Sequence, residues 1–391
     1  MKIAIVFEIF LPVVNGIITS SVNLAENLMA QGHEVIFIAP RTDDPEQVSS
    51  VGKIPVFTIQ STRNSSYPGM RNVLPWNRRV EIILERESVD ILHITGPWLL
   101  TIACVRAARK LKIPVVHTFH TMLHEPAYIL YMFKTPLMVP VMKRVAWWWY
   151  KMFVTRAVVN TGPSQMVCDQ LQQHFPEAAI HYVSNGVDVA RFLNGASFEA
   201  VQEQYPEFNE TTMLYVGRVG SEKSVDELVE AMAILRHSNP EIRLFVVGDG
   251  PAMLRCTVLA RAIGVPDRVS FLGRIPHEEL LTSGLIQNAR AFITASTTEN
   301  QPMTVIEATC CGTPALVPDV EGIRELVFEN GLLFSPHNVK DIARAMRQIC
   351  TDDVLHSSCS RATETMRNRY DGASVAREFI HLYQEALSKG S

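Results

Sequence analysis

The stretch IAIVFEIFLPVVNGIITSSVNLAENLMAQGHEVIFIA (3–39) decides the fold. It starts with an apolar run rich in β-branched residues and continues through a loop that closes on Asn15-Gly16. The apolar spacing then predicts a helix over 17–31, and a second apolar run follows at 35–39. Strand, helix and strand at this spacing predict a βαβ unit, in which the two strands are parallel.

The same alternation continues along the chain and starts again after a stretch rich in Glu and Gln at 194–210. We therefore expect an α/β protein of two facing, Rossmann-like, doubly wound domains, over 1–193 and 194–372. A terminal helix over 373–391 is expected to pack back on the N-terminal domain. Ligands of such sheets bind where strands end, so we expect an inter-domain cleft lined by residues that follow strands. The later strands are predicted at 90–95, 114–120, 157–160, 180–188, 212–217, 243–248, 269–273, 291–296 and 314–318.

The charge of the chain is mild on average and uneven along it. The 391 residues include 36 basic and 40 acidic ones, a net charge of −4, which argues against a nucleic-acid binder. The first 190 residues hold 17 basic and 14 acidic residues, +3, which leaves 19 and 26, −7, for the rest. Residues 126–168 contain no Asp or Glu but five Lys or Arg, together with eight aromatic residues and five methionines.

The cysteines and the apolar runs favour a cytosolic protein. Seven cysteines show no C-x-x-C pair and no regular histidine spacing, which favours reduced, buried thiols over a disulfide scaffold or a zinc site. The apolar run before Glu8 is too short for a signal-peptide core, and no run reaches the roughly 18 residues of a spanning helix.

Two features of the N-terminal half follow strands. The first loop has one glycine at its helix entry, Gly16, instead of the G-x-G-x-x-G fingerprint, which disfavours an oxidoreductase but still lets a ligand approach the backbone. The alternative is a simple turn residue. His120 ends the strand PVVHTFH and is expected to point into the cleft, whereas His117 lies on the other side of the strand and is expected to pack.

The C-terminal half predicts a diphosphate site. In YVGRVGSEK (215–223), Arg218 follows a strand and Lys223 stands at the next helix start, so two cations and the helix N–H groups can meet phosphate oxygens. The alternative is an exposed loop with two unrelated charges. In VVGDGPAM (246–253), Gly248 and Gly250 would permit a nucleotide to approach closely, although many α/β turns share this pattern.

The segment from Glu299 to Glu307 is the strongest local pattern. Pro302 suits the first position of a helix, which would leave the N–H groups of Met303 and Thr304 for phosphate oxygens. The two carboxylates lie eight residues apart and can meet different parts of one ligand. Their alternative roles are a partner for the helix dipole and a member of an ion pair.

These motifs together resemble glycosyltransferase family 4, the retaining enzymes of the GT-B fold, over nearly the whole chain. The matching pieces are FLPVVNGI (10–17), HTFHT (117–121), SNGVD (184–188), GRVGSEK (217–223), GDGP (248–251) and ENQPMTVIE (299–307) with the following ATCCGTP. Ser184 stands where proline is usual, and Pro302 where many members have glycine. The resemblance implies that Gly16 lies against the donor diphosphate, His120 near the transferred sugar, Arg218 and Lys223 on the phosphates, Glu299 on the sugar hydroxyls and Glu307 on the ribose.

The expected reaction needs no metal and no cofactor. The chain has no Asp-x-Asp pair to hold a divalent ion on the diphosphate, so the cations and the helix start must stabilise the leaving group. The resemblance implies retention of configuration by front-face displacement, with no carboxylate nucleophile. The expected donor is a nucleotide-diphosphate sugar, with UDP favoured over GDP.

The window 126–168 suggests the acceptor. Aromatic residues and cations without acids suit an anionic membrane surface, which predicts peripheral binding at the inner face of the membrane. FLPVVNGI is also most similar to members that glycosylate diacylglycerol or phosphatidylinositol. A glycolipid synthase is therefore the favoured hypothesis; the alternatives are a soluble transferase for a sugar, polysaccharide or small metabolite, and a sugar-nucleotide-binding protein without catalysis. A buried inter-domain helix with a basic rim would also explain the window. The predicted contact residues are Lys143, Arg144, Trp147, Trp148 and Lys151.

Overall fold

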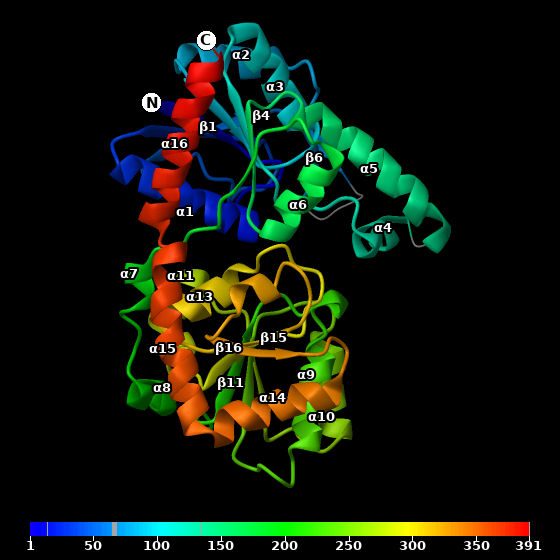
Figure 1. Ribbon diagram of the computed structural model, residues 1–391, viewed down its shortest axis with the longest axis vertical. Coiled ribbons are helices and arrows are strands. Elements are labelled where there is room, and N and C mark those ends of the chain that lie inside the picture. Colours follow the sequence, from blue (N-terminus) through cyan, green and yellow to red (C-terminus); the bar gives the residue numbers. More distant parts are fainter. Residues whose placement is uncertain (14, 65–68, 134, 391) are drawn as a thin grey trace. The chain divides into compact units, whose positions relative to one another are not determined.

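The computed structural model describes residues 1–13, 15–64, 69–133 and 135–390, and divides into two compact units. Unit 1 comprises 1–186 and 372–391, and unit 2 comprises 187–371. Each unit has its own parallel sheet flanked by helices (Figure 1). The two-domain α/β fold expected from the sequence is confirmed.

Unit 1 is built on an eight-stranded sheet. Its strands are β1 (Lys2–Val6), β2 (Glu34–Pro40), β3 (Ser50–Val51), β4 (Ile54–Ile59), β7 (Ile91–Ile94), β8 (Val115–Thr118), β9 (Val159–Gly162) and β10 (Ile180–Tyr182), with a small β5 (Thr62–Arg63) and β6 (Arg71–Asn72) ribbon. The order is β10-β9-β8-β7-β1-β2-β4-β3, and all neighbours are parallel except β3 and β4. Its helices are α1 (Gly16–Ala30), α2 (Arg78–Arg86), α3 (Leu99–Leu111), α4 (Pro126–Phe133), η1 (Pro136–Met138), α5 (Val139–Val154), α6 (Gln165–His174) and α16 (Gly372–Gly390).

Alternating side chains of β1 pack into two hydrophobic cores, one on each face of the unit 1 sheet. Ile3 and Ile5 pack under α1 and α16, while Ala4 and Val6 pack under α2 and α3. The helix α1 starts as the sequence suggested, because the Asn15 side chain caps it by accepting the Ile18 N–H at 2.9 Å. The helices α1 and α16 lie side by side (Figure 1), so the last helix of the chain packs within unit 1.

Unit 2 is built on a six-stranded, fully parallel sheet. Its strands are β11 (Thr212–Val216), β12 (Arg243–Val247), β13 (Val269–Gly273), β14 (Ala291–Ile293), β15 (Ala315–Pro318) and β16 (Gly331–Phe334), in the order β13-β12-β11-β14-β15-β16. Its helices are α7 (Val189–Phe192), α8 (Phe198–Gln204), η2 (Ser221–Lys223), α9 (Val225–Ile234), α10 (Met253–Ala262), α11 (His277–Thr282), α12 (Leu285–Asn288), α13 (Met303–Cys311), η3 (Arg324–Leu326), α14 (Val339–Thr351) and α15 (Asp353–Tyr370).

The first unit ends before the boundary that the sequence predicted after residue 193. Asp188 caps α7 by accepting the Ala190 N–H, and Phe192 of α7 is buried in a core of unit 2. The segment 187–193 therefore belongs to unit 2, because the side chain of Phe192 is buried there. Val187 also forms a parallel bridge with Asp371, where the chain returns to unit 1.

None of the seven cysteines, all of which the structure describes, forms a disulfide, and six of them are buried. Among the residues that the structure describes, none of the helices has the length and apolarity needed to cross a bilayer.

Candidate active site

The point where strand order reverses in the unit 2 sheet lies between β11 and β14, and two predicted site residues meet there. Lys223 follows β11 and Glu299 follows β14, and the Lys223 Nζ donates to Glu299 Oε1. Both side chains are about one-fifth exposed. Ser296 also donates to Glu299 Oε1, at 3.1 Å, and is itself fully buried. The sequence missed Ser296, although a small polar residue at a strand end is a signal that could have found it.

The side chain of Arg218 pairs with Glu222 and is 62% exposed, so it can turn toward a ligand.

The loop that carries Arg218 packs closely against the loop after β12. A Cβ on Gly248, whose φ is +138°, would lie 1.8 Å from the carbonyl oxygen of Gly217, and a Cβ on Gly250 would lie 2.4 Å from the carbonyl oxygen of Val219. Close approach of the two loops therefore requires these glycines. Their contact with a nucleotide stays a prediction.

The helix α13 begins one residue later than the sequence suggested. Pro302 has an extended backbone (ψ 119°) and is the N-cap, so Met303 is the first helical residue. The Val305 N–H donates to the carbonyl oxygen of Pro302 at 3.2 Å. The N–H groups of Met303 and Thr304 thus lie ahead of that bond, at the positive end of the helix dipole.

Glu307 lies on α13 with its side chain only 3% exposed. Its Oε1 is 3.0 Å from Nε2 of His277, the first residue of α11. This hydrogen bond and the negative charge of Glu307 raise the pKa of His277, against the effect of burial. The sequence missed His277, which follows β13 and so fits the rule that site residues stand after strands.

In unit 1, Gly16 is the exposed first residue of α1, and His120 stands two residues beyond β8. His120 is half-buried, and desolvation lowers its pKa to about 4, so its imidazole is neutral near pH 7. A water-sized cavity of about 20 Å³ is lined by His120, His93 and Thr118, among others. His117 is buried against the rings of Phe119 and Phe153, as expected for a packing residue.

Beside His120 runs a buried hydrogen-bonded chain that the sequence did not indicate. His93 Nδ1 lies 2.7 Å from the Tyr383 hydroxyl of α16, and His93 Nε2 lies 2.7 Å from Thr118 Oγ1. Thr118 in turn bonds to Thr161, at 2.7 Å. Burial lowers the pKa of His93 to about 3, so this imidazole is neutral. The chain joins the last helix to the strand that precedes His120.

Glu8 occupies the corresponding reversal point of the unit 1 sheet, between β1 and β7. Its Oε1 accepts the Thr101 N–H at 2.8 Å and its Oε2 the Leu100 N–H at 3.3 Å, at the start of α3. Desolvation raises the pKa of Glu8 to about 7. The sequence showed only that a charge interrupts an apolar run.

The predicted membrane contacts on α5 separate into two groups. Trp147 stacks on His174, with ring centroids 3.6 Å apart and planes at 7°, so packing occupies its ring. Trp148, by contrast, is 70% exposed. Arg144 and Lys151 are exposed and Lys143 is half-buried. Lys134, a further cation of the window, lies outside the described residues.

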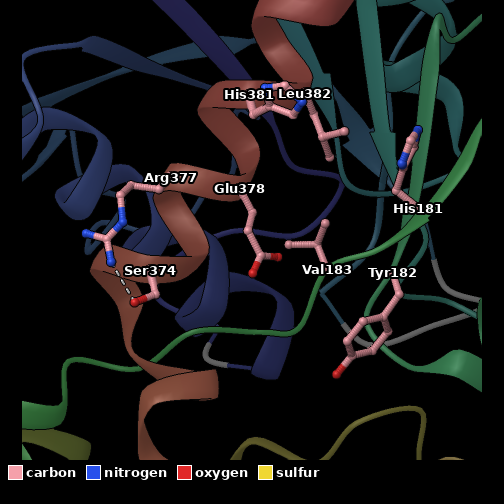
Figure 2. Close-up of a pocket in the computed structure, with 8 residues that line it drawn as sticks. All are labelled: His181, Tyr182, Val183, Ser374, Arg377, Glu378, His381 and Leu382. Carbon is pink, nitrogen blue, oxygen red and sulfur yellow. Dashed lines mark hydrogen bonds between the residues drawn. The ribbon is translucent and has the colours of Figure 1, made fainter.

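A second hollow in unit 1 contains none of the predicted site residues. It has a volume of about 520 Å³ and lies between α16 and the segment 181–183. Figure 2 shows Arg377 and Glu378 of α16 on one wall and Tyr182 on the other, with Arg377 hydrogen-bonded to Ser374 at 2.8 Å. Within the described part of the chain, no group of three His, Cys, Asp or Glu side chains is placed to hold a metal ion.

The protein has two doubly wound sheets, and in unit 2 cations, carboxylates and the start of a helix follow the strands at the point where strand order reverses. This combination is typical of the class of GT-B glycosyltransferases. Comparison with known proteins agrees. The model for Glycosyltransferase Family 4 matches residues 14–191, and that for Glycosyl transferases group 1 matches residues 197–369. The chain belongs to glycosyltransferase family 4 and is a glycosyltransferase that acts on a sugar nucleotide.

Two relatives and one solved structure show the range of this similarity. A GDP-mannose-dependent alpha-mannosyltransferase of Corynebacterium glutamicum is 29% identical, over 94% of this chain and 85% of its own. The alpha-monoglucosyldiacylglycerol synthase of Acholeplasma laidlawii is 26% identical, over 100% and 98%. HepE from Anabaena, solved with UDP, has a TM-score of 0.76 and 17% identity, over 98% of this chain and 100% of HepE.

Proposed function

We propose that the protein transfers a hexose, with retention of configuration, from a nucleotide-diphosphate sugar to a membrane lipid such as diacylglycerol. The main support for a lipid acceptor is the exposed apolar face of η1 and α5. A relative named as a monoglucosyldiacylglycerol synthase, similar over the full length, supports the same acceptor.

The α5 face is defined by side chains that return every three or four residues along η1 and α5. Leu137 is 85% exposed, Val141 53%, Val145 42% and Trp148 70%, so an apolar stripe faces outward. Arg144 and Lys151 are exposed on the same helix, and no acid occurs from 126 to 168. An apolar stripe flanked by cations suits an anionic bilayer, where each cation contributes about 1 kcal/mol. Figure 1 shows α4 and α5 at the side of unit 1.

The donor chemistry follows from unit 2. The bond between the anomeric carbon and the diphosphate oxygen breaks, and negative charge develops on that oxygen. Arg218, Lys223 and the start of α13 stabilise this charge. The acceptor hydroxyl forms the new bond on the same face of the sugar and gives its proton to the leaving phosphate. Glu299 keeps its hydrogen bonds to Lys223 and Ser296 and orients the sugar hydroxyls rather than attacking the anomeric carbon.

Two residues of unit 1, His120 and Gly16, are also proposed to contact the donor. Because the pKa of His120 is about 4, its neutral imidazole offers a hydrogen bond to the sugar near pH 7 and adds no positive charge. Gly16, at the exposed start of α1, offers backbone N–H groups to the diphosphate. We propose UDP rather than GDP as the donor nucleotide. Arg218 and Lys223 would stabilise the negative charge of the diphosphate, a role that a metal ion has in other transferases.

The test is flotation with liposomes, combined with transfer to diacylglycerol. We expect the protein to float with anionic but not with zwitterionic vesicles, and Trp148→Ala to reduce both flotation and transfer. Trp76→Ala is the matched control, because Trp76 is 67% exposed elsewhere in unit 1. No flotation together with no lipid product would overturn the proposal. Release of nucleotide with a soluble acceptor in that case would identify a soluble transferase, and donor binding without release would identify a non-catalytic binding protein.

A further inference from the structure

His277 forms a hydrogen bond with the buried carboxylate of Glu307. It lies outside the sequence motifs that predict the donor site. Its Nε2 lies 3.0 Å from Glu307 Oε1, and the two residues stand 30 positions apart, on α11 and α13. The side chain of Glu307 is 3% exposed and that of His277 is 37% exposed. The carboxylate is thus withdrawn from water, while the imidazole that holds it remains in contact with water.

One ion pair joins α11, which begins with His277, to α7. Arg191 of α7 lies 3.1 Å from Asp188 and 3.3 Å from Glu278, through its Nε and Nη1 respectively. Asp188 is the last residue of the SNGVD motif and caps α7. Arg191 thus lies between the last residue of that motif and the second residue of α11.

The charges around His277 favour its protonated form. Glu307 faces it from α13 and Glu278 follows it on α11, and both carboxylates raise the pKa of His277. Arg191 on α7 and burial lower it, but the hydrogen bond to Glu307 is the largest effect, and the pKa lies above its ordinary value of 6.5. The protonated form of His277 is therefore more stable here than in a free imidazole.

We propose that His277 is the positioning residue of Glu307 and that its protonation strengthens the binding of the sugar nucleotide. This inference rests on the proposed role of Glu307 as the carboxylate that accepts the ribose hydroxyls. When His277 is protonated, the pair carries no net charge. When it loses its proton, the negative charge of Glu307 is left uncompensated near a donor whose two phosphates are also negative, and the imidazole can adopt the tautomer that no longer donates to Oε1.

The experiment measures the dissociation constants of UDP-glucose and GDP-mannose by calorimetry from pH 5.5 to 8.5, without acceptor. The diphosphate of either donor does not titrate in this range, because each of its phosphates carries one ester bond and one anhydride bond and keeps only a strongly acidic oxygen. We expect the dissociation constant of the natural protein to rise about threefold or more with pH. His277→Gln keeps an N–H donor within reach of Glu307 but cannot titrate, so its affinity should be nearly independent of pH. His277→Ala should bind weakly at every pH.

His337→Gln is the matched control, because His337 pairs with Glu227 at 2.8 Å in the same unit but stands apart from the site motifs. It should keep the pH dependence of the natural protein. If neither donor binds at any pH, the proposed function fails and this inference fails with it. If a donor binds but the pH profile is flat, or survives unchanged in His277→Gln, the inference alone is overturned.

Discussion

Replacing Glu8 by Gln tests how the reversal point of the unit 1 sheet is built. Glu8 is 8% exposed, and both its carboxyl oxygens accept N–H groups at the start of α3. Burial penalises the charged carboxylate more than these hydrogen bonds stabilise it, so the pKa rises from 4.5 to about 7. Above pH 7 the folded protein must therefore hold a carboxylate that water solvates better in the unfolded chain.

The sign and the size of the effect follow from this pKa. Between pH 4.5 and 7 the unfolded chain has released the proton of Glu8 and the folded chain keeps it, so the free energy of unfolding falls as pH rises. The interval is about 2.5 pH units, and at 1.36 kcal/mol per unit the loss amounts to about 3 kcal/mol. The contribution is fully present below pH 4.5 and is lost once the pH passes 7.

Urea unfolding followed by tryptophan fluorescence measures this contribution in the intact chain, because all the tryptophans lie in unit 1 with Glu8. We expect Glu8→Gln to gain about 3 kcal/mol of unfolding free energy relative to the natural protein between pH 4.5 and 8. Burial lowers the pKa values of His93 and His117 to about 3, but both titrate in both proteins and cancel in the difference. Parallel pH curves for the two proteins would refute the reasoning. The tryptophans are Trp76, Trp98, Trp147, Trp148 and Trp149.

Two substitutions in unit 2 test the geometry of the donor site. Gly248→Ala would place a Cβ 1.8 Å from the Gly217 carbonyl oxygen at a positive φ, so we expect about 2 kcal/mol or more of destabilisation in thermal unfolding and a loss of activity. An unchanged unfolding midpoint would contradict this close approach. Ser296→Ala removes a hydrogen bond to the charged Glu299, worth about 2 kcal/mol, so kcat/KM for nucleotide release should fall about tenfold or more. Full activity would show that Lys223 orients Glu299 without help.

The parts of the fold that depend on local pattern were predictable, and the details of where elements begin were not. The helix after Asn15 was visible, because its cap and its apolar spacing are both local. The start of α13 was predicted one residue early, because Pro suits both the N-cap and the first helical position, and only the extended ψ of Pro302 distinguishes them. The domain boundary was placed too late, because the burial of Phe192 in unit 2 depends on contacts distant in sequence.

The candidate site divides in the same way. Residues that follow strands within a motif, such as Arg218 and Lys223, could be proposed from the sequence because the carboxyl ends of parallel strands share one edge of the sheet. Trp147 and Trp148 are neighbours in sequence and were both predicted to touch a membrane, yet one stacks on His174 and the other is 70% exposed. Composition gives the charge and the aromatic content of a helix, but only packing decides which side of that helix faces outward.

The partners of the donor-site carboxylates were out of reach of the sequence for a further reason. Glu299 pairs with Lys223 across 76 residues, and Glu307 pairs with His277 across 30. Two carboxylates beside a diphosphate would repel it, and pairing each one with a cation removes most of that repulsion while leaving its oxygens as acceptors for hydroxyl groups. In the sequence, Glu299 and Glu307 stand in one segment, while Lys223 and His277 stand in two others. Only the fold pairs Glu299 with Lys223 and Glu307 with His277, and under the proposed function this pairing would let a site that contains two acids bind an anionic donor.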